Sequence, residues 1–321
     1  MDLANKYRPQ TLAELVGQDV VTRVLADELR NNKLRQQYLF VGNTGSGKTT
    51  ASRILAKEVN GITYEIDAAS HSSVEDIRAL IETVAVKPMG VDKIVIILDE
   101  VHGLSNKAIQ TLLLTLEKPP KHAMFILCTT EADKVPNTIK NRCECFTFRR
   151  IDANIIAERL EYICNKEGIE YAKPALLLIA KIADGSMRQA ISYLEQCSTE
   201  RVSMSWVSSV LRGSTYTEEI RLFFDIVDSK EQEIIMLLNK IENPKKFLDN
   251  FFCTVLDLLI YTRTTNTSEI TMPLEVIQDV GKLSEKEQEV ANQLMDKMFD
   301  LEATCKDNPI LRQLMIARFL P

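Results

Sequence analysis

The feature that most constrains this chain is a glycine-rich segment, Gly42-Asn43-Thr44-Gly45-Ser46-Gly47-Lys48-Thr49-Thr50. It follows an apolar, β-prone run at Tyr38–Val41 and precedes a stretch with helical spacing. The segment matches G-x-x-x-x-G-K-[ST] in the strand–turn–helix setting that makes this pattern credible. Glycines let the backbone curl so that its N–H groups surround phosphate oxygens, and the following helix adds a favourable dipole. The segment therefore predicts a phosphate-binding loop for a nucleotide.

A pair of carboxylates strengthens this prediction. Asp99-Glu100 closes the apolar run Lys93–Leu98, and ligands of parallel sheets bind at the carboxyl ends of strands. Two adjacent acidic residues at a buried strand end are costly unless they serve a ligand. We expect Lys48 to neutralise the β and γ phosphates, and Thr49 and Asp99 to hold Mg²⁺. Glu100 is expected to activate the attacking water, so ATP and Mg²⁺ are the expected cofactors.

The first 150 residues alternate β-rich runs with helical patterns, which predicts a parallel sheet covered by helices. Ser105 can cap a helix that Pro119-Pro120 ends. Strands are expected at Tyr38–Val41, Ile62–Ala68, Lys93–Leu98, Ala123–Thr129 and Cys145–Phe148.

After Ile151 the β signals disappear, and only helical patterns follow. Helices are expected at Asn154–Asn165, Pro174–Ala183, Met187–Cys197, Ile220–Val227, Ile234–Ile241, Phe247–Ile260 and Val290–Leu301, with a capping box at Ser284 and Glu287 before the last. We therefore predict three domains: an α/β domain over 1–150, a small helical domain over 151–212 and an all-α domain over 213–321.

Composition sets further limits. The chain is 45% hydrophobic and 26% charged, which is typical of a soluble globular protein. No apolar run approaches the roughly 20 residues that span a bilayer, and Met1–Lys6 does not start a signal peptide, so a cytoplasmic location is expected. Seven scattered cysteines without a Cys-x-x-Cys pair favour reduced, mostly buried thiols. A metal site at Cys143 and Cys145 stays open, although no further ligand lies nearby.

Charge is distributed unevenly around the net value of −6. From Gly213 onward there are 12 basic and 19 acidic residues, a net charge of −7, which leaves +1 for the first 212 residues. Any contact with nucleic acid is therefore expected in the first two-thirds of the chain, through local basic faces.

Several further motifs occur in a specific order. They are Lys6–Pro9, Val16–Gln18, Ile66–Ser70, Asp99–His102, Leu116–Pro120, Thr129-Thr130, Asn141–Cys143 and Gly185–Ala190. Together with the glycine-rich loop, they resemble the gamma/tau subunits of bacterial DNA polymerase III from Lys6 to about Leu211. Replication factor C small subunits are similar over much of the same stretch.

The resemblance implies a P-loop AAA+ domain with a parallel sheet, a small helical lid and an all-α C-terminal collar that mediates oligomerisation. It implies an ATP-hydrolysing motor subunit of a DNA sliding-clamp loader. The partners implied are other clamp-loader subunits in a homo- or hetero-oligomer, expected to be pentameric, together with the sliding clamp and primer–template DNA.

Site roles follow from the same resemblance. Thr130 matches the sensor of the γ-phosphate, and Arg188 matches the second sensor on the lid. Arg142 matches the arginine finger that reaches a neighbouring subunit's ATP, although by itself it would be an ordinary surface residue. Tyr7, Arg8 and Val16 match the segment that lines the adenine pocket.

The chain also departs from the family pattern. Only Asn60-Gly61 separates Val59 from Ile62, where the family usually carries a four-cysteine zinc module. Asn141 replaces a serine before the finger arginine, and His71-Ser72-Ser73 lacks the basic residues often found there. The chain ends at Pro321 without the long tau extension.

Two other functions remain open. A hexameric helicase or branch-migration motor would be expected to carry a basic C-terminal domain, which the −7 balance disfavours. A scaffold subunit without hydrolysis is disfavoured by the intact Lys48, Thr49, Asp99 and Glu100. The apolar faces of the C-terminal helices could also fill a local core rather than bind neighbours.

Overall fold

The computed structural model describes residues 2–70, 72–87, 93–212, 214–241, 243–264, 270–304 and 311–320. The chain forms two compact units. The first comprises Met1–Arg159 with Ala183–Ser192, and the second comprises Leu160–Ile182 with Tyr193–Pro321. The predicted boundaries near 150 and 212 differ from this division and stay predictions; Gly213 and His71 lie outside the described residues.

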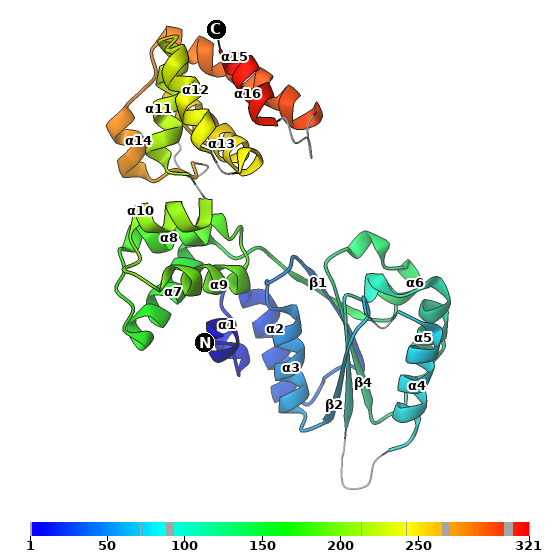
Figure 1. Cartoon of the computed structure of the whole chain (residues 1–321). Coiled ribbons are helices and arrows are strands. Elements are labelled where there is room, and N and C mark those ends of the chain that lie inside the picture. Colours follow the sequence, from blue (N-terminus) through cyan, green and yellow to red (C-terminus); the bar gives the residue numbers. More distant parts are fainter. Residues whose placement is uncertain are drawn as a thin grey trace. The chain divides into compact units, whose positions relative to one another are not determined.

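The first unit is built on a five-stranded, all-parallel sheet (Figure 1). Its strand order is β2-β3-β4-β1-β5, so the strand that leads into the glycine-rich loop lies inside the sheet. The predicted parallel sheet is confirmed, and no strand end is shifted by more than one residue. The strands are β1 Gln37–Gly42, β2 Ile62–Asp67, β3 Ile94–Asp99, β4 Ala123–Thr129 and β5 Glu144–Phe148.

Helices cover both faces of this sheet, which explains why the central strands are apolar throughout. Along β3, Ile94, Ile96 and Leu98 join the core under α4 and α5, whereas Val95 and Ile97 join the core under α2 and α3. The helical elements of this unit are α1 Leu3–Lys6, η1 Leu12–Glu14, α2 Asp19–Arg30, α3 Lys48–Glu58, α4 Val74–Ala85, η2 Val101–Gly103, α5 Asn106–Glu117, η3 Ala132–Lys134 and α6 Asn137–Lys140.

Helix caps explain where several of these helices begin. The Ser105 side chain accepts a hydrogen bond from the Ala108 N–H at the start of α5, as predicted. Helix α4, which the sequence analysis did not predict, begins with a capping box between Ser73 and Asp76. A short connection stands where the family usually carries a zinc module, because α3 ends at Glu58 and β2 begins four residues later.

Most of the described residues after β5 lie in helices, and each expected helix is present. They are α7 Ala153–Glu167, α8 Lys173–Ile182, α9 Met187–Cys197, α10 Met204–Val207, the π-helical turn η4 Ser208–Arg212, α11 Tyr216–Val227, α12 Glu231–Lys240, α13 Pro244–Arg263, α14 Leu274–Val280, α15 Glu285–Thr304 and α16 Leu311–Phe319. At the start of α15, the Ser284 N–H donates to Glu287 Oε2 at 2.6 Å, which confirms the predicted capping box. Helices α14 and α16 were not predicted.

The prediction of mostly buried thiols is only half right. Cys128, Cys164 and Cys197 are buried, Cys143 is half-buried, and Cys145 and Cys253 are exposed. Cys305 lies outside the described residues. Within the described ranges, no helix has the length and apolar character needed to cross a membrane.

Candidate active site

The glycine-rich loop joins the end of β1 to the start of α3. Gly45 and Gly47 have φ angles of +75° and +106°, which side chains rarely tolerate. A Cβ at Gly47 would lie 2.9 Å from Leu15 Cδ1, and a Cβ at Gly45 would collide with the Ser186 hydroxyl. The loop therefore forms a narrow backbone cradle at a helix N-terminus, as a phosphate group requires.

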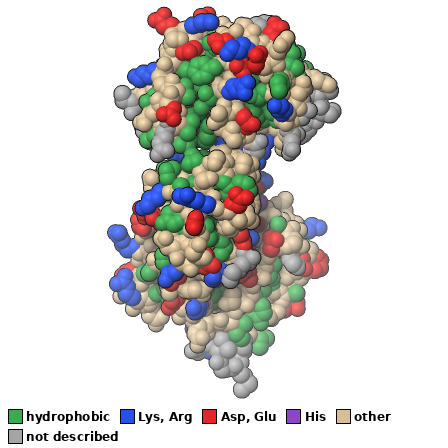
Figure 2. All heavy atoms as spheres, turned by 60° about the vertical axis from the view of Figure 1, so that its left-hand side comes forward, with side chains coloured by type: hydrophobic (Ala, Val, Ile, Leu, Met, Phe, Trp, Pro, Cys, Tyr) green, Lys and Arg blue, Asp and Glu red, His purple; other side chains and the backbone are tan. Residues whose placement is uncertain are grey.

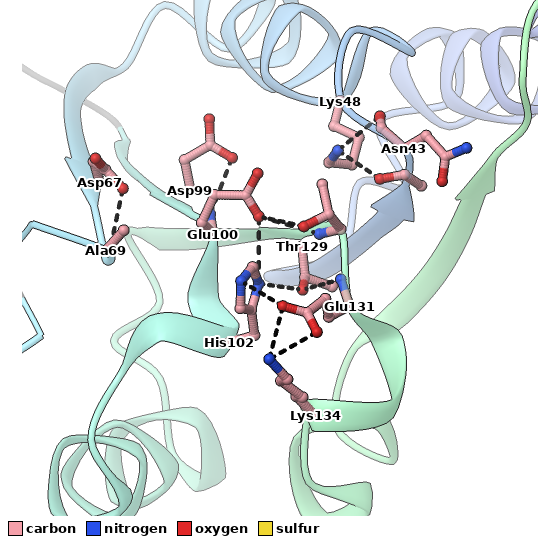
Figure 3. Close-up of polar contacts among 12 residues, drawn as sticks. Asn43, Lys48, Asp67, Ala69, Asp99, Glu100, His102, Thr129, Glu131 and Lys134 are labelled. Atoms are coloured by element: carbon pink, nitrogen blue, oxygen red, sulfur yellow. Dashed lines mark hydrogen bonds and ion pairs between the residues drawn. The ribbon is translucent and has the colours of Figure 1, made fainter. Parts of the chain in front are cut away.

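Lys48 is buried within this cradle. Its side-chain ammonium donates to the main-chain oxygens of Gly42 at 2.7 Å and Asn43 at 3.1 Å (Figure 3). Burial lowers the pKa of Lys48, an effect that the negative charges of Glu100 and Asp99 partly oppose. Among the described residues, the Lys48 ammonium donates only to main-chain carbonyls and has no carboxylate partner. A buried positive charge of this kind is electrostatically suited to bind a polyphosphate.

The two expected Mg²⁺ ligands are in direct contact. The Thr49 hydroxyl donates to Asp99 Oδ2 at 2.6 Å, which connects the first turn of α3 to the end of β3. Hydroxyl and carboxylate oxygens are ligands that Mg²⁺ accepts, usually together with waters and substrate phosphates. The residues present therefore fit a nucleotide-bound Mg²⁺.

Glu100 points away from Asp99 and toward the end of β4. Its backbone adopts the left-handed conformation, with φ +49°, which separates the directions of the two adjacent carboxylates. Glu100 Oε2 accepts hydrogen bonds from the Thr130 N–H at 3.2 Å and the Thr130 hydroxyl at 3.0 Å. The structure thus brings the predicted water-activating residue to the predicted sensor.

A cavity of about 290 Å³ surrounds the glycine-rich loop. Arg188 is exposed at this cavity, and its guanidinium has no hydrogen bond or ion pair with any residue that the structure describes. Gly42, Asn43 and Thr130 do not line the cavity themselves, but they contact Lys48 and Glu100. The predicted site residues that do line it are Tyr7, Arg8, Val16, Thr44, Gly45, Ser46, Gly47, Lys48, Thr49, Thr50, Asp99, Glu100 and Arg188.

Arg142 lies elsewhere on the first unit. It follows α6 and borders a separate hollow that Arg35, Cys143 and Glu144 also line. Its guanidinium forms an ion pair with Glu117, with Nη2 and Oε1 2.6 Å apart. The structure therefore does not bring Arg142 to the cavity of its own chain.

The sequence analysis missed residues that support the site. The buried Gln18 side chain donates to the main-chain oxygens of Arg149 at 2.7 Å and Ser46 at 3.3 Å, which connects the glycine-rich loop to the end of β5. Arg53 lines the cavity and donates to Glu65 Oε2 at 2.7 Å. Helical spacing could have indicated Arg53, which is one turn beyond Thr49 on α3. No local signal indicated the partners of Gln18.

Two family models match the chain. One, described as DNA polymerase III, delta subunit, matches residues 61–152. The other, described as DNA polymerase III clamp loader subunit, ATPase lid domain, matches residues 155–198.

Curated relatives match over a longer stretch. The chain is 32% identical to DNA polymerase III subunit tau of Bacillus subtilis, over 92% of this chain and 57% of that protein. It is also 32% identical to DNA polymerase III subunit gamma of Buchnera aphidicola subsp. Baizongia pistaciae, over 80% of this chain and 77% of that protein. The chain thus spans 57% of the tau subunit of B. subtilis but most of a gamma subunit.

Among solved structures, the Thermotoga maritima RuvB Holliday junction branch migration motor matches with a TM-score of 0.55 and 16% identity. That match covers 87% of this chain and 99% of RuvB, and at such low identity it shows the fold alone. The parallel sheet, the glycine-rich loop and the lid match give the chain the architecture of an AAA+ ATPase. With a gamma subunit matched over three-quarters of its length, the chain belongs to the gamma/tau family of DNA polymerase III.

Proposed function

We propose that this chain is an ATP-dependent motor subunit of a DNA sliding-clamp loader. It couples ATP binding and hydrolysis to the opening of the clamp and its loading on primer–template DNA. The observation that carries the proposal is a single cavity lined by the glycine-rich loop, Thr49, Asp99 and Arg188. Membership in the gamma/tau family connects this cavity with DNA replication.

Bound ATP with Mg²⁺ would supply the phosphoanhydride bond that is broken and the charge that polarises it. Lys48 would neutralise phosphate charge from its buried position, and the N–H groups at the start of α3 would donate to phosphate oxygens. Thr49 and Asp99, which already touch, would hold the metal.

Hydrolysis requires a base and fixed positive charges near the γ-phosphate. Glu100 would accept the proton of the attacking water, and Thr130 would hold the Glu100 carboxylate in place. Arg188, whose guanidinium is unpaired among the described residues, would contact the phosphates of its own chain. Tyr7, Arg8 and Val16 would line the base-binding end of the cavity.

Assembly is proposed because Arg142 borders a different hollow from the ATP cavity. In an oligomer, expected to be a pentamer with other clamp-loader subunits, Arg142 would serve a neighbour's site. Exposed apolar side chains on two C-terminal helices support a collar: Met236 on α12 is 62% exposed and Phe299 on α15 is 66% exposed. Figure 2 shows hydrophobic side chains in patches among charged ones on the C-terminal helices. Such patches commonly mark interaction sites.

DNA is expected to be gripped through its phosphates rather than its base edges. Positive and negative side chains are interspersed on the face in Figure 2, which fits local contacts better than one broad basic surface. Binding should therefore depend weakly on sequence and fall steeply with salt concentration.

The test is the ATPase rate of the chain with its partner subunits, measured with and without primed DNA and the cognate clamp. Stimulation that needs both DNA and clamp supports clamp loading. A rate that ignores the clamp favours the helicase or branch-migration class. No hydrolysis with every partner present would identify a scaffold subunit.

A further inference from the structure

His102 lies between two carboxylates beside the proposed water-activating residue (Figure 3). It belongs to η2, directly after Glu100, and its side chain is 18% exposed. The ring nitrogen Nδ1 is 3.3 Å from Glu100 Oε2, and Nε2 is 3.2 Å from Glu131 Oε1. Nδ1 is also 3.0 Å from the Thr129 hydroxyl. The imidazole therefore bridges the loop after β3 and the end of β4.

The residues that contact the His102 ring opposite Glu100 are themselves hydrogen-bonded. Glu131 receives a hydrogen bond from Lys134 at 2.9 Å, and the Glu131 N–H donates to the Thr129 hydroxyl at 3.0 Å. Glu131 and Thr129, both at the end of β4, thus contact the two nitrogens of the His102 ring. The hydrogen bond at Nδ1 and the nearby Glu131 carboxylate at Nε2 favour one orientation of the ring.

The contacts of Glu100 are uneven between its two oxygens. Oε2 faces His102 Nδ1 and accepts both hydrogen bonds from Thr130, whereas Oε1 has no hydrogen bond with a described residue. Glu100 lines the nucleotide cavity. Because Oε2 is occupied, Oε1 is the oxygen available to accept a proton from water.

We propose that His102 is a positioning residue for Glu100. This role rests on the proposed function of Glu100. His102 Nδ1 and Thr130 hold Oε2, so that Oε1 faces the nucleotide cavity. His102 does not itself touch the reacting atoms. It acts on the rate of hydrolysis through the orientation of Glu100, because small misplacements of a catalytic group cost much of its effect.

The test compares three substitutions of His102 in the complete assembly. His102→Ala should lower kcat roughly tenfold and leave KM and ATP affinity unchanged. His102→Asn should recover most of the rate, because its amide nitrogen is as many bonds from the backbone as Nδ1. His102→Gln places its amide near the position of Nε2 and should not recover it. A fall in kcat without a matching change in KM would show that His102 acts by positioning Glu100 rather than by binding ATP.

Two controls complete the design. Lys134→Ala removes only the outer contact of Glu131 and should keep the wild-type rate within about twofold, since exposed ion pairs contribute little. In single turnovers, His102→Ala added to Glu100→Gln should cause no further loss, because both act through one carboxylate. If His102→Ala keeps full kcat, if Asn fails to recover the rate, or if the losses add, the inference is wrong. If Glu100→Gln alone leaves turnover intact, the proposed role of Glu100 fails instead.

Discussion

The Arg142 guanidinium is anchored by Glu117, whose Oε1 lies 2.6 Å from Nη2. Arg142 Nη1 also donates to the main-chain oxygen of Thr138 at 2.6 Å. Arg142, which follows α6, is thereby tied to the C-terminal end of α5 and to α6 itself. Both guanidinium edges have partners, so Arg142 is held in one orientation beside the hollow that it borders.

Arg142→Ala should leave ATP binding nearly intact and lower hydrolysis in the assembly by about 10³-fold or more, because an arginine finger contributes roughly 10³–10⁵ in rate. Equilibrium binding and single-turnover hydrolysis measure the two effects separately. A parallel loss of binding and hydrolysis would contradict a role in a neighbour's site.

Glu117→Gln should reduce turnover of the assembly several-fold, on the order of 3- to 10-fold, by freeing Arg142 from its anchor. Stability should not change, since the pair is partly exposed and such pairs contribute little. The measurement is kcat beside a thermal melt, with the neighbouring exposed Lys118→Ala as the matched control. Unchanged kcat in Glu117→Gln would show that Arg142 needs no anchor.

ATP binding should take up protons at alkaline pH through Lys48. Burial lowers the pKa of Lys48, and phosphate charge in the complex should raise it again. Affinity should therefore fall as pH rises through the pKa that Lys48 has in the ATP-free form. Calorimetry over a series of alkaline pH values, in two buffers with different ionisation heats, measures the uptake. Lys48→Arg, which stays charged, should abolish it. Equal heats in both buffers for the wild type would refute this linkage.

Glu219→Ala should destabilise the second unit. The Glu219 carboxylate is fully buried, accepts from Arg212 Nη2 at 2.7 Å and from the Ser214 hydroxyl at 2.6 Å, and also contacts the Thr254 hydroxyl. Removing Glu219 leaves the buried Arg212 guanidinium without a carboxylate partner, which costs about 3–5 kcal/mol.

The matching control is the exposed pair of Lys173 with Glu161 in the same unit. Lys173→Ala should barely move the unfolding midpoint. Urea unfolding of both variants measures the difference, and similar midpoints would mean that the buried pair contributes no more than the exposed one.

Much of the architecture could be predicted because local signals and burial agree. The run at Ile94–Leu98 is apolar on both faces, and it forms the interior strand β3 with cores on either side. The helices α2 and α4 were missed although their buried apolar residues fall at helical spacing, as Val21 and Leu25 do on α2. The strands at the sheet edges carry a less apolar pattern: β5 alternates exposed with buried positions, and β2 has only exposed and half-buried positions.

For the site, the phosphate loop and the acidic pair could be read directly, because each needs a fixed spacing of particular residues. The contacts of Gln18 with Arg149 and of His102 with Glu131 could not be predicted from the sequence. These residues meet only when separate strand ends lie at one edge of the sheet. The direction of the Glu100 carboxylate was likewise hidden, because it depends on a left-handed backbone angle.

The amino-acid sequence by itself determined that this chain has a phosphate-binding loop, a parallel sheet and helical C-terminal parts, because each follows from local spacing and apolar pattern. Only the tertiary structure decided which side chains share the cavity and which, like Arg142, lie apart from it. The physical reason is that side-chain contacts across strands depend on strand order, and strand order is set by packing of the whole sheet.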